Sequence, residues 1–294
     1  GIRETNGKMI EKENWDHDEK IFLERMKKIL PMKKEEEKIS IIILTDGNGN
    51  KIKDLLKDIQ TYTNHKHEII IIINEQDEKL KTECIRTIQE TVVNLDNLKI
   101  LKLEKELSVP DARNYGARLS SGNFICFIDD DARILGRYNQ ATDWLDYLYN
   151  RFHEEPDVAG VSPIKTWYDP LKTYCLSVAC LFTSKKVFEI VGGFDPVFGN
   201  KEKGTWGYED VDWSYRAVSL GFKLLRVKGF EFPFYHEDTT FKPKSERYQK
   251  GLIKAEEILL SKYDLNEINY FSNRTIYPFT PEQIEIQGTK LNIG

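Results

Sequence analysis

Residues 39–50 read Ile39-Ser40-Ile41-Ile42-Ile43-Leu44-Thr45-Asp46-Gly47-Asn48-Gly49-Asn50, an apolar run that ends in a polar turn. An unbroken apolar run of this length is typical of a strand that is buried on both faces. After the turn, Ile52, Leu55, Leu56 and Ile59 recur at the spacing of an amphipathic helix. This strand–turn–helix start indicates the α/β class.

The same alternation continues along the chain. Further expected elements are a strand at Glu68–Ile73, a helix at Lys79–Leu95, a strand at Leu98–Leu103, a helix at Asp111–Ser120 and a strand at Phe124–Ile128. Strands that alternate with helices predict a mostly parallel sheet with helices on both faces. Ligands of such sheets bind beyond the carboxyl ends of the strands, where Thr45, Asp46, Asn74 and Glu75 are expected.

Composition excludes several classes of protein. The 294 residues contain 48 acids and 43 bases, a net charge of −5, which argues against a general nucleic-acid binder. With 40% hydrophobic and 12% aromatic residues, the chain is expected to fold. No apolar run approaches the roughly 20 residues of a membrane-spanning helix.

Cysteine usage and the start of the chain bear on the compartment. The four cysteines show no CxxC spacing and only five histidines accompany them, which argues against a zinc site and favours a reducing compartment. No signal peptide pattern opens the chain. We therefore expect a cytoplasmic protein.

Two common nucleotide motifs are absent. Gly47-Asn48-Gly49 begins like a dinucleotide-binding turn, but Ile52 stands where the third glycine would be. The sequence also contains no GxxxxGK[ST] phosphate loop. A dehydrogenase and a P-loop enzyme are therefore disfavoured.

Three adjacent acids, Asp129-Asp130-Asp131, follow the strand that ends at Ile128. Adjacent carboxylates repel one another, and a divalent cation is the simplest way to neutralise them. Mg²⁺ and Mn²⁺ are held by one or two carboxylates together with substrate phosphate oxygens. The alternative is a solvated acidic loop.

Four further blocks stand out in sequence order. They are Val109-Pro110-Asp111-Ala112-Arg113-Asn114-Tyr115-Gly116-Ala117, then Ser121-Gly122-Asn123 with the strand ending in Asp129-Asp130-Asp131, then Val191-Gly192-Gly193-Phe194-Asp195, then Trp206-Gly207-Tyr208-Glu209-Asp210. Together they resemble the family 2 type of GT-A glycosyltransferase. They are similar to the family's ARN-x-G helix, its small-residue turn with the DxD motif, its GGFD turn and its WGxED segment. The similarity covers roughly residues 38 to 240.

This resemblance implies the donor and metal residues. Asp129 and Asp131 take the places of the two DxD acids, which bind the donor's ribose and a Mn²⁺ or Mg²⁺ ion, and Asp130 lies between them. Arg113 takes the place of an arginine that faces the nucleotide or diphosphate. His236 falls where several members supply a third metal ligand; a surface or core histidine is the alternative.

The donor's base is less well specified. Family members often end the second strand in adjacent aspartates that recognise uracil, whereas this chain has Asn74-Glu75-Gln76-Asp77. Glu75 or Asp77 is a candidate substitute, and Asp46 a candidate for a base or ribose contact. Thr45 and Asn74 complete the predicted donor side, with a UDP-sugar as the favoured donor.

Catalysis is expected at Glu209-Asp210. A sugar acceptor must lose a proton, which a carboxylate can accept. We assign Asp210 as the base and Glu209 as an acceptor contact, with helix capping as the alternative and Asp212 as a weaker candidate base. Retaining relatives carry Asn at the position of Asp210, so an inverting mechanism is favoured.

Aromatic side chains surround this segment. Trp206, Tyr208 and Trp167 are candidates to stack on the acceptor, with ordinary packing as the alternative for each. The acceptor class is open among glycans, lipid carriers and peptides.

We expect three regions: a charged helical extension at 1–37, the GT-A domain at 38–241, and a helix with an irregular tail at 242–294. The extensions are candidates for self-association. A sugar nucleotidylyltransferase is the alternative enzyme, although the turn after Thr45 lacks the arginine of its glycine-rich loop. A non-catalytic nucleotide-sugar or glycan binder is the third hypothesis.

Overall fold

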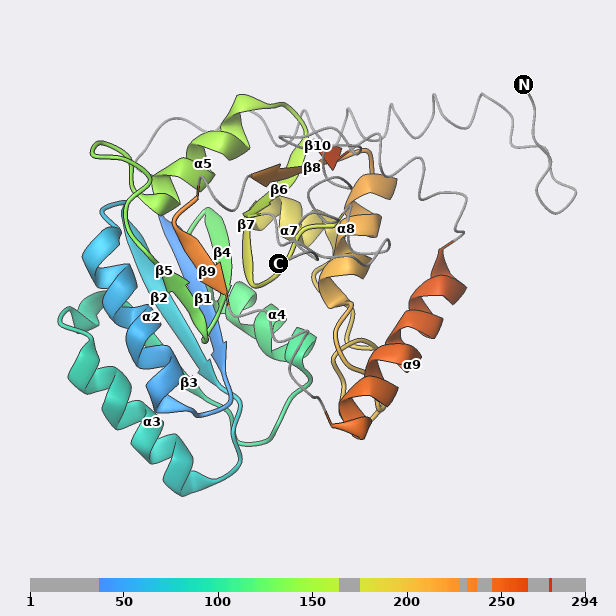
Figure 1. Cartoon of the computed structure of the whole chain (residues 1–294), viewed down its shortest axis with the longest axis horizontal. Helices are drawn as coiled ribbons and strands as arrows, with labels where there is room; N and C mark the ends of the chain where they lie inside the picture. Colours follow the sequence, from blue (N-terminus) through green and yellow to red (C-terminus); the bar gives the residue numbers. More distant parts are fainter. Residues whose placement is uncertain (1–36, 164–174, 228–231, 237–244, 264–274, 277–294) are drawn as a thin grey trace, which may run out of the picture.

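The fold is built on an eight-stranded sheet (Figure 1). A computed structural model describes residues 37–163, 175–227, 232–236, 245–263 and 275–276. The strands of the large sheet are β1 (Ile39–Thr45), β2 (His67–Ile73), β3 (Leu98–Lys102), β4 (Phe124–Asp129), β6 (Val158–Pro163), β7 (Cys180–Ser184), β8 (Lys223–Val227) and β10 (Thr275–Ile276). Their order across the sheet is β10-β8-β6-β7-β4-β1-β2-β3, and β5 (Ala132–Ile134) pairs with β9 (Phe234–His236) in a second, two-stranded sheet.

The prediction of a mostly parallel sheet is confirmed. Strand β1 pairs in parallel with β2 on one side and with β4 on the other, so that Ile41 lies between Ile69 and Cys126. Strand β7 is antiparallel to both β4 and β6. The carboxyl ends of β1, β2 and β4 consequently meet at one edge of the sheet.

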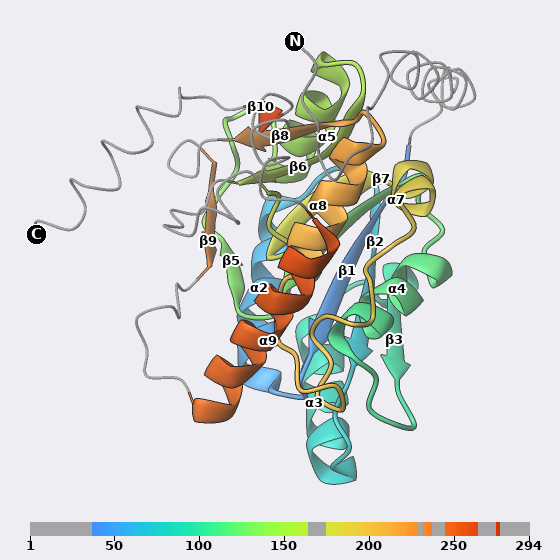
Figure 2. The ribbon, with the colours of Figure 1, turned by 90° about the vertical axis from the view of Figure 1, so that its right-hand side faces the viewer.

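Helices cover both faces of the sheet, as expected (Figures 1 and 2). The helices are α2 (Gly49–Tyr62), α3 (Glu78–Thr91), α4 (Val109–Leu119), α5 (Trp144–Glu154), α7 (Lys185–Val191), α8 (Glu209–Ser219) and α9 (Glu246–Lys262), with a short 3-10 turn, η1, at Leu95–Asn97. The prediction for α3 extended too far: the helix ends at Thr91, the β-branched Val92 is extended, and Leu95 starts η1.

Alternation along the strands divides the core in two. Ile39, Ile41 and Ile43 of β1 point into the core shared with α2, α3 and α5. Ile42, together with Ile70 of β2, points into the core shared with α4, α7, α8 and α9. Since successive side chains of a strand alternate between faces, the continuous isoleucine run supplies both cores.

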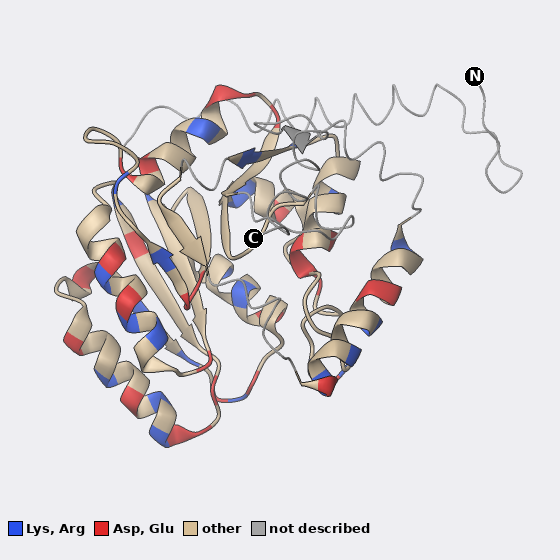
Figure 3. Cartoon of the chain, viewed as in Figure 1, with Lys and Arg blue, Asp and Glu red and all other residues tan. Residues whose placement is uncertain are grey.

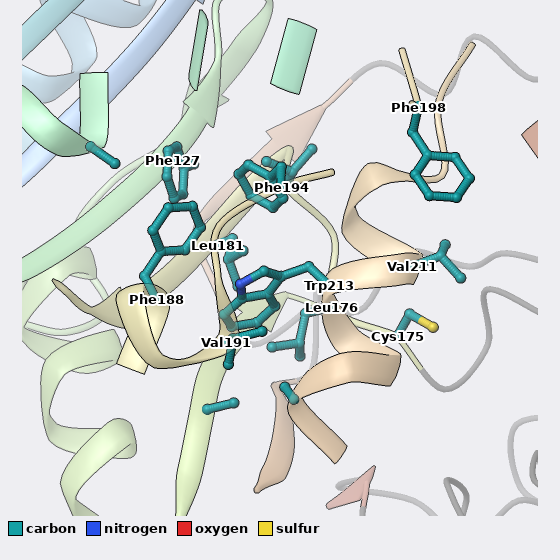
Figure 4. Packing of buried hydrophobic residues seen from close by; sticks show 14 of the residues in the cluster. Phe127, Cys175, Leu176, Leu181, Phe188, Val191, Phe194, Phe198, Val211 and Trp213 are labelled. Carbon is teal, nitrogen blue, oxygen red and sulfur yellow. The ribbon is translucent and has the colours of Figure 1, made fainter. Parts of the chain in front are cut away.

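An aromatic cluster fixes α8 against the sheet (Figure 4). Phe188 of α7 lies 5.2 Å from Phe127 of β4 and 5.1 Å from Phe194, measured between ring centroids. Trp213 of α8 is fully buried and stacks on Phe188 at 6.0 Å. The start of α8, which carries Glu209 and Asp210, is thereby tied to the strand that ends in Asp129.

Positions occupied by Lys or Arg and positions occupied by Asp or Glu are interspersed along α2, α3 and α9 (Figure 3). The four cysteines, all within the described ranges, are buried thiols. Among the helices that the structure describes, none combines the length and the apolar character needed to cross a membrane. The expected helical extension at 1–37, apart from residue 37 itself, and the candidate acceptor residue Trp167 lie outside the described residues.

Candidate functional site

Two carboxylates and one imidazole meet beyond the carboxyl end of β4. Asp129 is the last residue of that strand, and Asp131 directly precedes β5. His236 comes from β9, whose antiparallel register with β5 places it opposite Ala132. The Nε2 atom of His236 lies 3.1 Å from Asp129 Oδ2 and 3.0 Å from Asp131 Oδ1. All three side chains are partly exposed, so the cluster is accessible to a ligand.

The ligand atoms of this cluster suit a divalent cation. One atom from each of Asp129, Asp131 and His236 can be chosen so that all three lie within 4.8 Å of one another. Carboxylate oxygens with one imidazole nitrogen form a set that Mn²⁺ accepts, and Mg²⁺ is likewise held by a few carboxylates. The hydrogen bond from His236 lowers the pKa of Asp131, which favours the charged form that a metal ligand requires.

Asp130, the middle acid of the run, makes different contacts. It is buried, and its pKa is raised to about 7 by that burial, while a hydrogen bond with Thr45 opposes the shift. Its Oδ2 atom has no hydrogen-bond partner among the described residues. A buried acceptor of this kind suits a hydroxyl group of a ligand.

Lys51, in the first turn of α2, places a positive charge near Asp130. Its Nζ atom lies 3.4 Å from Asp46 Oδ2. Burial favours the neutral amine, but the carboxylates of Asp130 and Asp46 raise the pKa of Lys51 overall. Lys51 was not among the predicted site residues. Its place at the start of α2, six positions after the last residue of β1, could have indicated that it lies near the site.

Arg113 of α4 connects the cluster of Asp129, Asp131 and His236 with the acids at the start of α8. Its Nη2 atom donates to Asp129 Oδ1 at 2.8 Å, and its Nη1 atom donates to Glu209 Oε1 at 2.6 Å. The guanidinium is buried, and although burial alone would lower its pKa, Asp129 and Glu209 raise it. One fixed positive charge therefore lies between two carboxylates that come from distant parts of the chain.

The next residue of α4, Asn114, holds the turn after α7. Its Nδ2 donates to the Phe194 carbonyl at 2.8 Å, and its Oδ1 accepts from the Phe194 N–H at 2.9 Å. Gly193 passes so close that a Cβ there would lie 2.8 Å from Asn114 Oδ1, and its φ is +69°. The glycine of the GGFD-like turn is therefore required both by its backbone conformation and by the asparagine of the ARN-like helix.

Glu209 and Asp210 are the first two residues of α8, as the sequence predicts. Gly207 and Tyr208 before them both have left-handed backbone conformations, with φ of 68° and 72°. Such a conformation is uncommon for a tyrosine, and strained residues cluster at functional sites. The double reversal turns both acids inward, where each is buried.

The two acids have different partners. Asp210 accepts hydrogen bonds from the backbone N–H groups of Val178 at 3.1 Å and Val211 at 2.9 Å. Glu209 accepts from Arg113, but its Oε2 atom has no hydrogen-bond partner among the described residues and points toward Gly199. Burial raises the pKa of Glu209, and Arg113 opposes that shift.

Asp212, the weaker candidate base, lies deeper. Its side chain is fully buried and accepts hydrogen bonds from Arg216 on α8 at 2.8 Å and from Tyr263 after α9 at 2.8 Å. Lys262 also forms an ion pair with it. These contacts give Asp212 a role in holding α9 against α8.

The predicted donor residues at the ends of β1 and β2 lie side by side, because these strands are neighbours in the sheet. The Asn74 amide is occupied at both ends by the Leu107 backbone, at 2.9 and 3.0 Å. The Glu75 carboxylate accepts from the backbone N–H groups of Gln76 and Asp77 and packs against Gly47. Their assignment to the donor stays a prediction.

The predicted acceptor aromatics differ in exposure. Trp206 is partly exposed and lies 5.2 Å from Tyr248 of α9 between ring centroids. Tyr208 is buried, and its hydroxyl donates to Glu256 at 3.1 Å. A role in stacking on an acceptor stays a prediction for both residues.

Comparison with known proteins bears on the family. Residues 34–175 match the model of the family described as "Glycosyl transferase family 2". A curated relative, "Glycosyltransferase GlyA" of Streptococcus pneumoniae serotype 4, is 22% identical over 246 residues, which cover 83% of this chain. The chain spans only 30% of that relative's length.

Solved structures with the same fold include two glycosyltransferases. The mannosyltransferase PcManGT from Pyrobaculum calidifontis, in complex with GDP-Man and Mn²⁺, has a TM-score of 0.51 at 15% identity, covering 74% of this chain and 64% of that one. GalNAc-T7 with UDP, GalNAc and Mn²⁺ has a TM-score of 0.59 at 15% identity, covering 87% of this chain and 55% of that one. The predicted GT-A fold is confirmed.

Proposed function

We propose that this chain, whose residues 34–175 carry the glycosyl transferase family 2 match, is a metal-dependent glycosyltransferase with an inverting mechanism. It moves a sugar from a nucleoside-diphosphate sugar, with a UDP-sugar as the first candidate, to a hydroxyl group of a glycan, a lipid carrier or a peptide. The observation that carries the proposal is the meeting of Asp129, Asp131 and His236 at the carboxyl end of β4, linked through Arg113 to Glu209.

The donor side is assigned to the edge formed by β1, β2 and β4. Asp129, Asp131 and His236 would hold Mn²⁺ or Mg²⁺, which as a bound Lewis acid offsets the negative charge of the departing nucleoside diphosphate. Asp130 offers its unpartnered Oδ2 to a hydroxyl of the donor. Thr45 holds Asp130 through a hydrogen bond, and Lys51 adds a positive charge beside Asp130 and Asp46.

The acceptor side is assigned to the start of α8. Asp210, fixed by two backbone N–H groups, accepts the proton of the acceptor hydroxyl as that oxygen attacks the sugar carbon. Glu209 orients the acceptor through its unpartnered Oε2 atom, since its other oxygen is held by Arg113. A single displacement in this arrangement inverts the configuration at the sugar carbon.

A thermal-shift panel tests the proposal. The protein is heated with UDP, GDP and their sugars, each with and without Mn²⁺, because a ligand that binds the native state raises the melting temperature. We expect one nucleoside diphosphate to stabilise the protein only when Mn²⁺ is present. Stabilisation by no nucleoside diphosphate under either condition would contradict the proposal.

A further inference from the structure

Asp58 of α2 is a buried carboxylate outside the candidate site. Its side chain points toward β5, the strand that directly follows Asp131. Its Oδ2 atom accepts from Arg133 Nε at 2.5 Å and from the backbone N–H of Ile134 at 3.1 Å. Its Oδ1 atom accepts from Arg133 Nη2 at 3.0 Å. The acid therefore receives a two-pronged guanidinium and a backbone N–H from consecutive residues of β5.

Strand β5 is the direct continuation of the acidic run. Asp131 precedes Ala132, the first residue of β5, and Arg133 follows one position later. Strand β9 is registered on β5, so that Ala132 lies opposite His236 and Arg133 opposite Tyr235. Whatever fixes β5 therefore fixes both the backbone of Asp131 and the strand that carries His236. Figure 1 shows α2 beside this two-stranded sheet.

The contact exceeds what helix packing alone requires. The side chain of Asp58 is 9% exposed, and a carboxylate is costly to bury, whereas an apolar residue at the same place would pack without that cost. Asp54, one turn earlier on α2, offers the comparison, since its side chain is 54% exposed and lies 3.9 Å from Arg133 Nη1. Of these two acids, Asp58 is the one that is buried, accepts two hydrogen bonds from the Arg133 guanidinium and also binds the β5 backbone.

We propose that Asp58 is a positioning residue for the metal site: through Arg133 and the Ile134 N–H it holds β5 so that Asp131 and His236 face the same ion. The inference rests on the proposed function, because it requires that the cluster of Asp129, Asp131 and His236 binds a divalent cation. The hydrogen bonds of Asp58 go to Arg133 and to the Ile134 N–H, so its effect on the three side chains is transmitted by the backbone of β5.

The test measures Mn²⁺ binding and stability separately. Mn²⁺ alone is titrated into the whole chain, the free ion is followed by electron paramagnetic resonance, and the melting temperature is recorded in EDTA. Asp58→Asn keeps the size of the side chain and removes the charge. Asp54→Asn on the same helix is the matched control. Arg133→Lys keeps the positive charge and loses the two-pronged donor, and it serves as the second variant where Asp58→Asn fails to fold.

We expect Asp58→Asn to weaken Mn²⁺ binding about tenfold, as losses of outer-shell partners do, and Arg133→Lys to weaken it in the same direction. Asp54→Asn should bind Mn²⁺ as the unchanged protein does. A lower melting temperature in EDTA with unchanged Mn²⁺ affinity in both Asp58→Asn and Arg133→Lys would overturn the inference and leave Asp58 a packing residue. No Mn²⁺ binding by the unchanged protein would instead contradict the metal site of the proposed function, and the inference with it.

Discussion

Arg113 and Glu209, 96 positions apart in the sequence, are joined by a 2.6 Å hydrogen bond between buried side chains. The same guanidinium also holds Asp129, so the proposed metal site and the proposed acceptor site share one cation. Asn114, the adjacent residue, binds the turn at Phe194. All four sequence blocks that resemble family 2 glycosyltransferases therefore meet at one turn of α4, which itself carries the first of them.

Replacing Arg113 should be costly for stability. Arg113→Ala leaves the buried Glu209 and the partly exposed Asp129 without their shared cation, and removal of one partner of a buried pair such as Arg113–Glu209 costs about 3–5 kcal/mol. Urea denaturation measures the change in the free energy of unfolding. Arg118→Ala, an exposed arginine of the same helix, is the control and should change it by less than about 0.5 kcal/mol. Equal effects of the two substitutions would contradict the bridging role of Arg113.

Asp131→Asn should remove the metal dependence of donor binding. The substitution keeps the shape of the side chain but replaces a charged ligand oxygen with a weaker, neutral one. Thermal shifts with the stabilising nucleoside diphosphate should become independent of Mn²⁺, and Asp96→Asn, an exposed aspartate, should behave as the unchanged protein. A Mn²⁺-dependent shift of full size in Asp131→Asn would remove this residue from the metal site.

Gly193→Ala should destabilise the turn that Asn114 holds. The new Cβ would lie 2.8 Å from Asn114 Oδ1 at a residue whose φ is +69°, and such strain costs about 1–3 kcal/mol. Gly136→Ala is the control, because a Cβ there meets nothing within 4 Å. Their free energies of unfolding, compared in urea, should differ by that amount; a Gly193→Ala protein as stable as Gly136→Ala would rule the clamp out.

Glu68, at the amino-terminal edge of the sheet, should make stability depend on acid pH. Burial alone would raise the pKa of this carboxylate. The hydrogen bonds that it accepts from Ser40, Ser121 and Lys99 have the larger combined effect and lower its pKa to about 2. A lowered pKa stabilises the fold at pH above the ordinary value near 4.5, and this contribution is lost as the pH falls from there toward 2.

Urea denaturation of Glu68→Gln across this pH range measures the effect. At pH 7 the variant should be less stable by roughly 3–4 kcal/mol, since the pKa of Glu68 falls from 4.5 to about 2 and one pKa unit corresponds to about 1.4 kcal/mol. The difference should shrink as the pH approaches 2. Glu90→Gln, on the exposed side of α3, controls for loss of an acid. A difference that is constant from pH 7 to pH 2.5 would contradict the assignment.

Much of the half of the sheet formed by β1, β2, β3 and β4 is predictable from local sequence. The isoleucine runs of β1 and β2 are buried on both faces, so each strand is an unbroken apolar segment with clear ends. The acids after β4 are predictable as a site because parallel strands place their carboxyl ends at one edge. The reversal of β7 between β4 and β6 was not predicted, since strand direction depends on pairings far apart in the chain.

Side-chain pairings across long sequence distances were also beyond prediction. Arg113 was expected to face the donor, and nothing local shows that Glu209 would be its partner. Asn74 was assigned to the donor, whereas in the structure both ends of its amide bind the Leu107 backbone. The role of Asp58 likewise depends on the packing of α2 against β5, which sequence periodicity does not specify.

The central claim is metal-dependent sugar transfer with Asp210 as the base. The most direct test is hydrolysis of the stabilising nucleoside-diphosphate sugar, in which water takes the place of the acceptor: its oxygen bonds to the sugar carbon, its proton goes to Asp210, and the nucleoside diphosphate is released. Release is measured with and without Mn²⁺ for the unchanged protein, Asp210→Asn and Asp131→Asn. We predict release that requires Mn²⁺, falls at least about 100-fold in Asp210→Asn while donor binding persists, and is lost together with metal-dependent donor binding in Asp131→Asn. Release by Asp210→Asn at the rate of the unchanged protein, or release that ignores Mn²⁺, would contradict the account.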